Sequence, residues 1–279
     1  MTVDSPCGWD LVDNLLRGGS PCNGVGHELN AQFVQFLREA ERILIFTGPG
    51  VSRASSLPEM GEPQRAPPTP VTHQEFISSA DARMAYWEWK DRQWNQFRRA
   101  RPNAIHWAIV ELERAQKLEL LATHGVDGLQ LWAGTSPSRV VELHGSNAEL
   151  ECLVCGQRQD PGLHYQRFRR QGVVPTCDCG GFLKATALSL DQTPRLEDLE
   201  RAATAAAAAD LVVSVGSTLD TYPASSIPLL AAHNSVPYVV VSDEPTHHDD
   251  HPQVSLCLHG DLLSIFAPTV AAACHPRRM

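Results

Sequence analysis

Two ionisable side chains stand just after short apolar segments in the middle of the chain, where strands of a parallel sheet would end. Asp127 follows the run Leu-Glu-Leu-Leu-Ala through a glycine-punctuated loop, and His144 closes the run Val-Val-Glu-Leu. Ligands of parallel α/β sheets bind beyond the carboxyl ends of strands, so both side chains are site candidates. A histidine can act as a base because its imidazole titrates near neutral pH. A lone histidine at a strand end is more often structural, so its role depends on the residues around it.

Four of the eight cysteines form two tight pairs, Cys152-x-x-Cys155 and Cys177-x-Cys179, with 21 residues between the pairs. Glycines stand directly behind each pair, where they let backbone amides turn toward sulfur. Four thiolates make the closed tetrahedral shell of a structural zinc ion, so we predict that these cysteines bind zinc. Unrelated reduced cysteines and a redox Cys-x-x-Cys are the weaker alternatives. The scattered cysteines, which show no spacing pattern, are Cys7, Cys22, Cys257 and Cys274.

The chain has 279 residues and a formal net charge of -9. This length allows one large domain with a small insert. The acidic charge argues against general binding to nucleic acids or membrane surfaces, which needs a basic face, and it favours cationic partners such as lysine-bearing segments. The N-terminus lacks a basic start followed by a long apolar run, and no apolar stretch has the length of a membrane span. We therefore expect a soluble, cytoplasmic protein with neither a membrane nor a nucleic acid as direct partner.

Short apolar runs alternate with helical patterns along most of the chain, which predicts a parallel α/β sheet covered by helices. Polar or glycine-rich loops follow three of the runs, at Gly48–Ser52, Gly216–Leu219 and Ser242–Thr246. The predicted strands are 43–47, 118–122, 140–143, 211–215, 238–241 and 254–258. The predicted helices are 28–41, 84–89, 105–114, 194–210 and 223–233, with a short terminal helix after them.

The turn at Gly48–Ser52 has some features of a phosphate-binding loop. Glycine has no Cβ, so the backbone amides of such a turn can approach a phosphate. Pro49 removes one donor from the turn, and Arg53 stands where a dehydrogenase-type loop needs a small residue. From these residues alone, a structural turn and a nucleotide-binding turn are equally good interpretations.

Several independent stretches of the chain are similar, in the same order, to motifs of the sirtuins, the NAD-dependent protein deacylases. The resemblance runs from about Glu28 to the C-terminus, and the Glu-x-His-Gly-Ser sequence around His144 favours a catalytic histidine over a structural one. The similar stretches are Thr47–Ser52 (family T-G-A-G-I-S), Ser55–Pro58 (S-G-I-P), Pro102–His106 (P-N-x-x-H), Thr123–Leu129 (T-Q-N-I-D-G-L), Glu142–Ser146 (E-x-H-G-S), Cys179–Gly181 (second zinc knuckle) and Gly216–Ala224 (G-T/S-S-L-x-V-x-P-A).

The resemblance implies a Rossmann-like parallel sheet with helices on both faces, a small zinc-ribbon insert and a helical module. We place the Rossmann-like, NAD-binding domain at residues 28–146 and 183–279, and the zinc-binding domain at residues 147–182. A lid or helical module falls at about residues 55–100, where five prolines between residues 57 and 71 favour a mobile lid or linker. Residues 1–27 are expected to form a poorly ordered extension.

In the family's reaction NAD is a co-substrate that is cut rather than a hydride carrier. An acyl-lysine carbonyl oxygen attacks the ribose carbon as nicotinamide leaves, and a histidine then takes a ribose hydroxyl proton so that the acyl group can migrate. The resemblance assigns this role to His144 and a second catalytic position to Asp127. The NAD-binding positions that it implies are Gly48, Pro49, Gly50, Ser52, His124, Gly125, Asp127, Gly216, Ser217, Thr218, Ser242 and Asp243.

The chain departs from the family pattern around the expected site. The family's Gln-Asn before the aspartate is His124-Gly125 here, its Asp-Phe-Arg is Glu59–Gly61, and Ser242 stands where an adenosine-ribose asparagine is usual. The strand that pairs with the substrate peptide in the family corresponds to residues 187–192. Asp191 replaces a glycine in it, which would put a charged side chain where the peptide backbone approaches.

Three functions stay open on the sequence. An NAD-dependent protein-lysine deacylase, with an acyl-lysine protein as partner, follows from Asp127, His144 and the zinc-binding cysteines. A divergent NAD-cleaving enzyme or ADP-ribosyltransferase, acting on a small molecule or water, follows from the altered peptide strand and lid. A catalytically silent module that binds NAD or ADP-ribose follows from the lost asparagine and arginine positions. We favour the deacylase.

Overall fold

The computed structural model of the chain describes residues 24–55, 70–233 and 236–275. The proline-rich segment predicted as a lid or linker therefore falls almost entirely outside the described residues, and so does most of the predicted N-terminal extension. The first described helix, α2 (Gly24–Glu39), starts at Gly24 rather than at the predicted Glu28. Within the described ranges, no helix combines the length and apolar character that crossing a membrane requires.

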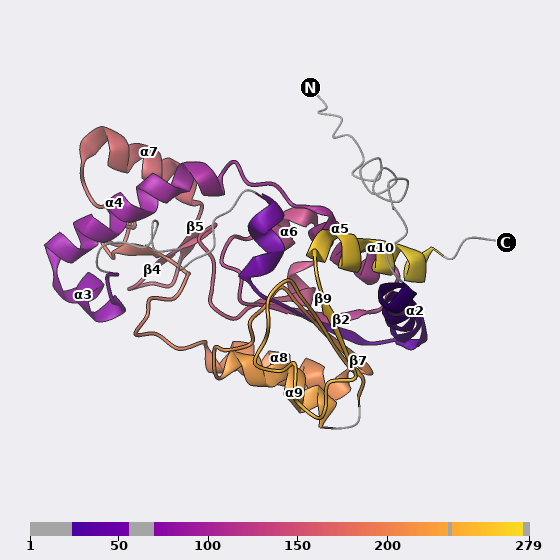
Figure 1. Cartoon of the computed structure of the whole chain (residues 1–279). Helices are drawn as coiled ribbons and strands as arrows, with labels where there is room; N and C mark the ends of the chain where they lie inside the picture. The colour runs from indigo at the N-terminus through magenta and orange to yellow at the C-terminus, as the bar shows by residue number, and fades with distance from the viewer. Residues whose placement is uncertain (1–23, 56–69, 234–235, 276–279) are drawn as a thin grey trace.

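A six-stranded sheet of parallel strands forms the centre of the molecule (Figure 1), which confirms the predicted α/β class. The strand order is β3-β2-β1-β7-β8-β9, so the chain builds outward from β1 in one direction and then from β7 in the other. Sheets of this kind bind ligands at the point where the strand order reverses, which here lies between β1 and β7. The strands are β1 Ile43–Thr47, β2 Leu118–Thr123, β3 Val140–Glu142, β7 Leu211–Val215, β8 Tyr238–Ser242 and β9 Leu256–His259.

Helices cover both faces of this sheet. In β1, Ile43 and Ile45 belong to the apolar core under α2, α5 (Ala104–Arg114) and α10 (Leu262–Cys274), whereas Leu44 and Phe46 belong to the core under α8 (Leu196–Ala208) and α9 (Ile227–Ala232). Every residue of β1, β7 and β8 is buried, which is why these strands are almost entirely apolar, with one serine or threonine each. Shorter segments are η1 Pro49–Ser55, α6 Leu129–Ala133, η2 Pro137–Arg139 and η3 Ala224–Ser226.

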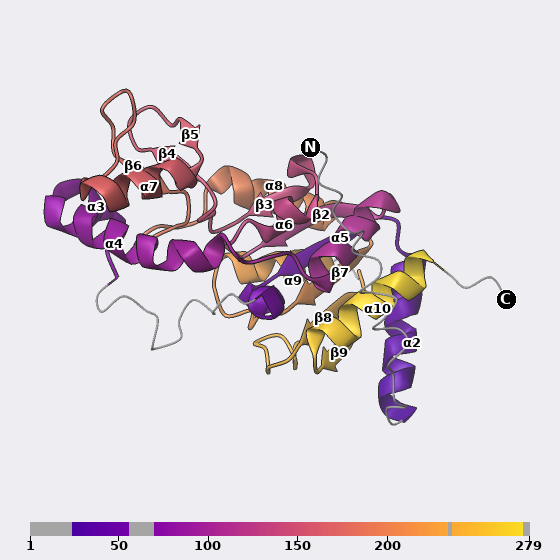
Figure 2. The same ribbon diagram turned by 90° about the horizontal axis from the view of Figure 1, so that it is seen from above.

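A second group of elements lies at one end of the molecule, beyond the main sheet (Figures 1 and 2). The group shares one apolar core, in which the Trp87 ring packs against the rings of Tyr165 and Phe168 at centroid distances of 5.2 and 5.8 Å. The helical module and the zinc insert therefore pack as one body, which we call the zinc lobe, and the division of the chain at residues 146 and 183 stays a prediction. The elements are α3 His73–Ser78, α4 Ala80–Phe97, α7 Pro161–Gln171 and the antiparallel strands β4 Leu150–Cys152, β5 Arg158–Gln159 and β6 Leu183–Ala185.

The structure brings Cys152, Cys155, Cys177 and Cys179 together, with all four sulfur atoms within 4.8 Å of one another. The sulfur of Cys152 lies 3.5 Å from that of Cys179, and those of Cys155 and Cys177 are 3.8 Å apart. Four thiolates at zinc-bond length in a tetrahedron are about 3.8 Å apart, so the cluster fits a structural zinc ion. A Cβ on Gly181 would stand 2.5 Å from the Cys152 sulfur, which explains the glycine there.

We predict that Cys177→Ala releases this zinc and opens the core around Trp87. Cys152 and Cys177 are themselves buried members of that core, so losing the metal should cost the zinc lobe at least about 3 kcal/mol of stability. Elemental analysis and the near-ultraviolet circular dichroism of the tryptophans measure the two effects. The control Cys274→Ala, on α10, should keep the zinc and the signal. A Cys177→Ala protein with its zinc retained would contradict the assignment.

Candidate active site

A cleft of about 680 Å³ opens beyond the carboxyl ends of β1, β2, β7 and β8. This volume is typical of sites for cofactors and other small molecules. The cleft lies where the strand order reverses, so its position agrees with the rule for parallel sheets. The predicted site residues that line it are Pro49, Gly50, Ser52, His124, Gly125, Asp127, His144, Gly216, Ser217, Thr218, Ser242 and Asp243. Gly48 lies beside the cleft, in the contact between two loops.

The loops after β1 and β7 touch each other directly. The amide of Gly48 donates to the Val215 carbonyl, and that of Gly50 donates to the Gly216 carbonyl, both at 3.0 Å. A Cβ on Gly48 or Gly50 would stand only 2.3 or 2.7 Å from the Gly216 oxygen. The sequence interpretation explained these glycines by the approach of a phosphate. In the structure the approach of the second loop requires them, and the Gly50 amide is already used.

Asp127 is held by both of its carboxylate oxygens. One oxygen accepts a hydrogen bond of 2.7 Å from the Ser52 hydroxyl, and the other accepts one of 2.8 Å from the Leu129 amide. Ser52 lies in η1, the 3-10 helix that follows β1, so the bond connects the β1 loop to the loop after β2. Asn103 supports η1 from behind, because its side-chain amide donates to the Val51 carbonyl at 2.7 Å. The Asp127 carboxylate is thus fixed in place at the wall of the cleft.

Two histidine rings form part of the cleft wall. The centroids of the His124 and His144 rings are 4.5 Å apart, and His124 also packs edge-on against Phe46 at 4.8 Å. Burial lowers the pKa of His144 below its ordinary value. Burial, with a smaller contribution from His144, lowers the pKa of His124 to about 3. Both rings are therefore neutral at pH 7, and a neutral imidazole at His144 can accept a proton.

Arg53 is a cleft residue that the sequence interpretation treated only as a misfit in the glycine-rich turn. Its guanidinium pairs with the carboxylates of Asp243 and Glu244, which follow β8. Arg53 therefore connects the β1 loop to the β8 loop across the cleft. A sequence signal for this contact does exist. Two acidic residues, Asp243 and Glu244, come just after one predicted strand, and the basic residue Arg53 follows the turn after another.

The segment 187–192, which corresponds to the family's peptide-pairing strand, is a loop in this structure, which contains no peptide, so its pairing with a peptide stays a prediction. The Asp191 carboxylate accepts hydrogen bonds from the amides of His73, at 2.6 Å, and Gln74, at 3.1 Å, at the start of α3. The charge of Asp191 is thus directed to the N-terminus of a helix, where it is stabilised. The expectation that it would oppose an approaching peptide backbone loses its support.

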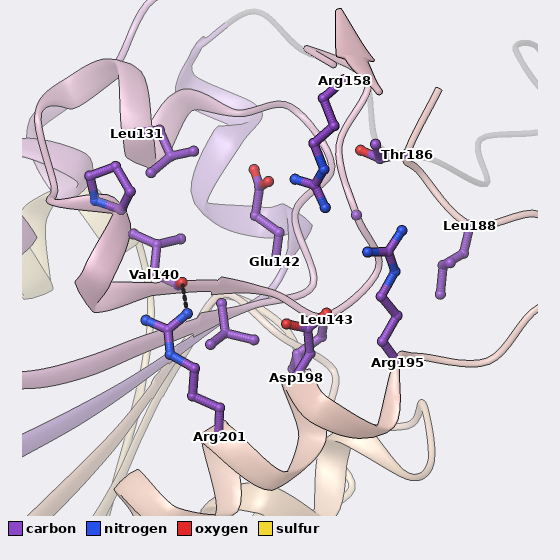
Figure 3. Close-up of a pocket in the computed structure, with 13 residues that line it drawn as sticks. Leu131, Val140, Glu142, Leu143, Arg158, Thr186, Leu188, Arg195, Asp198 and Arg201 are labelled. Atoms are coloured by element: carbon purple, nitrogen blue, oxygen red, sulfur yellow. Dashed lines mark hydrogen bonds between the residues drawn. The ribbon is translucent and has the colours of Figure 1, made fainter. Parts of the chain in front are cut away.

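A second, smaller cavity of about 240 Å³ is lined by residues of β3 and α8 and by Thr186 (Figure 3). Glu142 points into it, and burial together with the charge of Asp127 raises the pKa of Glu142 to about 7. Arg201 of α8 donates to the Val140 carbonyl at 3.0 Å. This contact ties α8 to β3 and so supports the strand that leads to His144.

Comparisons with known proteins agree with this architecture. The model of the Sir2 family matches residues 48–223. The NAD-dependent protein lipoamidase sirtuin-4, mitochondrial, of Bos taurus is 30% identical over 267 residues, which cover 84% of each chain. An NAD-dependent protein deacetylase of Rhodopseudomonas palustris is 31% identical over 222 residues, which cover 78% of this chain and 88% of the relative.

Two solved structures extend the similarity to three dimensions. One, from work on the mechanism and regulation of Sir2 enzymes, superimposes with a TM-score of 0.74 at 27% identity, covering 90% of this chain and 100% of that one. Another, a Sir2 enzyme bound to a myristoylated histone peptide, has a TM-score of 0.68 at 26% identity and covers 89% and 97% of the two chains. The chain belongs to the Sir2 family, the sirtuins, which are NAD-dependent protein deacylases.

Proposed function

We propose that this protein removes acyl groups from lysine side chains of other proteins, with NAD as co-substrate, and releases nicotinamide and acyl-ADP-ribose. The observation that carries the proposal is the placement of Asp127 and His144 in one cleft, the first fixed through both oxygens and the second neutral. The curated relatives are named as a deacetylase and a lipoamidase, and one similar enzyme binds an acylated peptide.

NAD would supply the ribose to which the acyl group is transferred. The loops after β1 and β7 line the cleft, and the hydroxyl groups of Ser217 and Thr218 would contact its phosphates and adenosine side. Ser242 and Asp243 would hold the adenosine ribose. Asp127, His124 and Gly125 lie on the side of β2, where the nicotinamide half would sit. These assignments are proposals about the cleft's own residues.

His144 has the properties of the base in this proposal. Its ring is neutral at pH 7 because burial disfavours the imidazolium, and it faces the cleft beside the His124 ring. It would take the proton of a ribose hydroxyl, and this hydroxyl would then receive the acyl group. Asp127 would hold the ribose in position, since its carboxylate is fixed by Ser52 and Leu129.

The acyl chain would lie against apolar side chains that reach the cleft from the zinc-lobe side. Phe97 ends α4, Val126 precedes Asp127, and Leu188 follows β6, and all three line the cleft. The amide of Leu188 donates to the His144 carbonyl at 2.9 Å, so this wall is attached to the strand end that carries the base. An acylated lysine entering here would bring its carbonyl to the same part of the cleft as His144. A cytoplasmic location stays a prediction.

Nicotinamide release separates this proposal from the two alternatives. We expect release from NAD only when an acyl-lysine peptide is present, with acetyl, lipoyl and myristoyl peptides as the test series. Release without any peptide would instead identify a hydrolase, or a transferase that uses a small-molecule acceptor. NAD binding by calorimetry with no release under any condition would identify a silent binding module. Absence of NAD binding would overturn all three.

We predict that His144→Ala lowers the yield of deacylated peptide by about 100-fold or more, the usual range for a general base. Exchange of labelled nicotinamide into NAD should persist, because the base acts only after nicotinamide has left. His233→Ala, on the outer end of α9, is the control and should change neither rate. Equal loss of both rates in His144→Ala would indicate a structural role.

The pH dependence of kcat/KM should follow the lowered pKa of His144. Activity requires the neutral ring and is lost as pH falls through this pKa, so the acid limb should lie below the ordinary histidine value of about 6.5. Glu142, with a pKa of about 7, also titrates nearby. Glu142→Gln should leave the limb in place. An acid limb at or above pH 6.5 in both proteins would contradict the assignment.

Gly125→Asn should raise kcat/KM for NAD by about 3- to 10-fold, because it adds a polar side chain beside Asp127 that can hydrogen-bond the co-substrate. A Cβ there would stand 3.6 Å from the Asp127 carboxylate and 3.1 Å from the Thr123 hydroxyl, so this hydroxyl has to shift by a few tenths of an ångström to admit the new side chain. Gly172→Asn, in open space at the end of α7, is the matched control. Unchanged or reduced activity in Gly125→Asn would show that the missing asparagine does not limit this enzyme.

A further inference from the structure

Three different metal-binding side chains come together beside β9, an edge strand of the main sheet. Figure 2 shows β9 far from β4 and β6, the strands next to the four cysteines. Cys257 and His259 lie two residues apart on the edge strand β9, so both side chains project from the same face. Asp249 lies in the segment between β8 and β9 and reaches the same point. One thiol, one imidazole and one carboxylate thus meet at a place that the deacylase site does not use.

The three side chains form a small triangle of contacts. The Cys257 sulfur lies 3.3 Å from one Asp249 oxygen and 3.2 Å from Nε2 of His259, and Nε2 lies 3.1 Å from the other Asp249 oxygen. Sulfur, nitrogen and oxygen ligands around a tetrahedral zinc ion are about 3.3 to 3.6 Å apart, given their usual bond lengths. The observed distances are within a few tenths of an ångström of these separations.

Hydrogen bonds alone leave this triangle incompletely satisfied. The Cys257 thiol can donate its proton to one Asp249 oxygen, and Nε2 of His259 can donate a proton to the other. The third contact, between the Cys257 sulfur and Nε2 of His259 at 3.2 Å, then has no remaining proton with which to form a hydrogen bond. A divalent cation bound by the thiolate, the imidazole and the carboxylate would replace all three contacts.

The carboxylate is oriented from its other side, as carboxylates that bind metals usually are. The amide of Thr246 donates to one oxygen of Asp249 at 2.9 Å, and the hydroxyl of Thr246 donates to the other at 2.6 Å. Cys257 packs against the apolar core under α8 and α9, whereas the His259 side chain is 45% exposed. The three side chains are thus held in place while one side stays open to solvent, so an ion and a water ligand can enter.

We propose that Asp249, Cys257 and His259 form a second metal site, which binds a divalent first-row transition ion of the zinc type with solvent as the fourth ligand. The donor set determines this class, because thiolate and imidazole select zinc-like ions over magnesium and calcium. Because this site has three protein ligands instead of four, one of them a half-exposed imidazole, it is weaker and more exchangeable than the four-cysteine site.

The metal would also stabilise part of the NAD cleft. Asp249 holds Thr246, and the amide of the next residue, His247, donates to the Thr218 carbonyl at 3.0 Å. Thr218 lines the cleft, as do Asp243 and Glu244 at the start of the same segment. An ion that joins Asp249 to β9 would fix this segment to the edge of the sheet.

Cobalt(II) is a suitable probe, because thiolate ligation gives it a charge-transfer absorption band. The protein is first treated with a mild chelator, which leaves the ion in the four-cysteine site, and is then titrated with Co²⁺. We expect one further equivalent with a thiolate band, and elemental analysis should rise from one to two ions per chain. Cys257→Ser should lose the additional ion and the band. The matched control Cys274→Ser should keep both.

The proposal fails if the wild-type protein takes up no second ion at micromolar free Co²⁺ or Zn²⁺. It also fails if Cys257→Ser retains the additional equivalent with its thiolate band. If Cys257→Ser does not fold, His259→Gln replaces it, since the half-exposed imidazole can be changed without opening the core. Retention of the second ion by folded His259→Gln at wild-type affinity would likewise overturn the site. Because these readouts need no NAD, they are independent of the deacylase activity.

Discussion

The contact between the loops that follow β1 and β7 determines where everything else in the site can lie. Side-chain-free positions at Gly48 and Gly50 let the Gly216 carbonyl approach so closely that a single Cβ would collide with it. Two backbone hydrogen bonds close the contact. From there the chain enters η1 and brings the Ser52 hydroxyl to Asp127. A larger side chain at either glycine would separate the two loops and move Ser52 away from the carboxylate.

The wall of the cleft shows how the departures from the family pattern are accommodated. His124, in place of the family's glutamine, packs between Phe46 and His144 and contributes a neutral ring instead of an amide. His144 is thereby supported mainly by packing and by the strand that leads to it. Asp191, which replaces the family's glycine, accepts hydrogen bonds from two backbone amides at the start of α3. These substitutions change contacts with the co-substrate, while the fixed carboxylate and the neutral imidazole are kept.

The sequence was sufficient for much of this architecture and insufficient for specific parts. The strands at 43–47 and 211–215 could be predicted because strands buried on both faces are mostly apolar over their whole length. The spacing of the paired cysteines predicted the four-cysteine cluster that the structure contains. By contrast, the hydrogen bond between Asp191 and the start of α3 could not be predicted, because it joins residues more than a hundred positions apart in the sequence. The spacing of Cys257 from the other cysteines likewise indicated no site, because the residue that it contacts is Asp249, in the loop between β8 and β9.

The central claim is that this cleft transfers an acyl group from a lysine to ADP-ribose, and the mass of the product tests it most directly. The protein would be incubated with NAD and an acyl-lysine peptide whose acyl group carries a heavy isotope. The account predicts an ADP-ribose product whose mass includes the labelled acyl group, together with an equal amount of deacylated peptide. Labelled free acid formed while NAD remains intact, or ADP-ribose without the label and with the peptide unchanged, would contradict it.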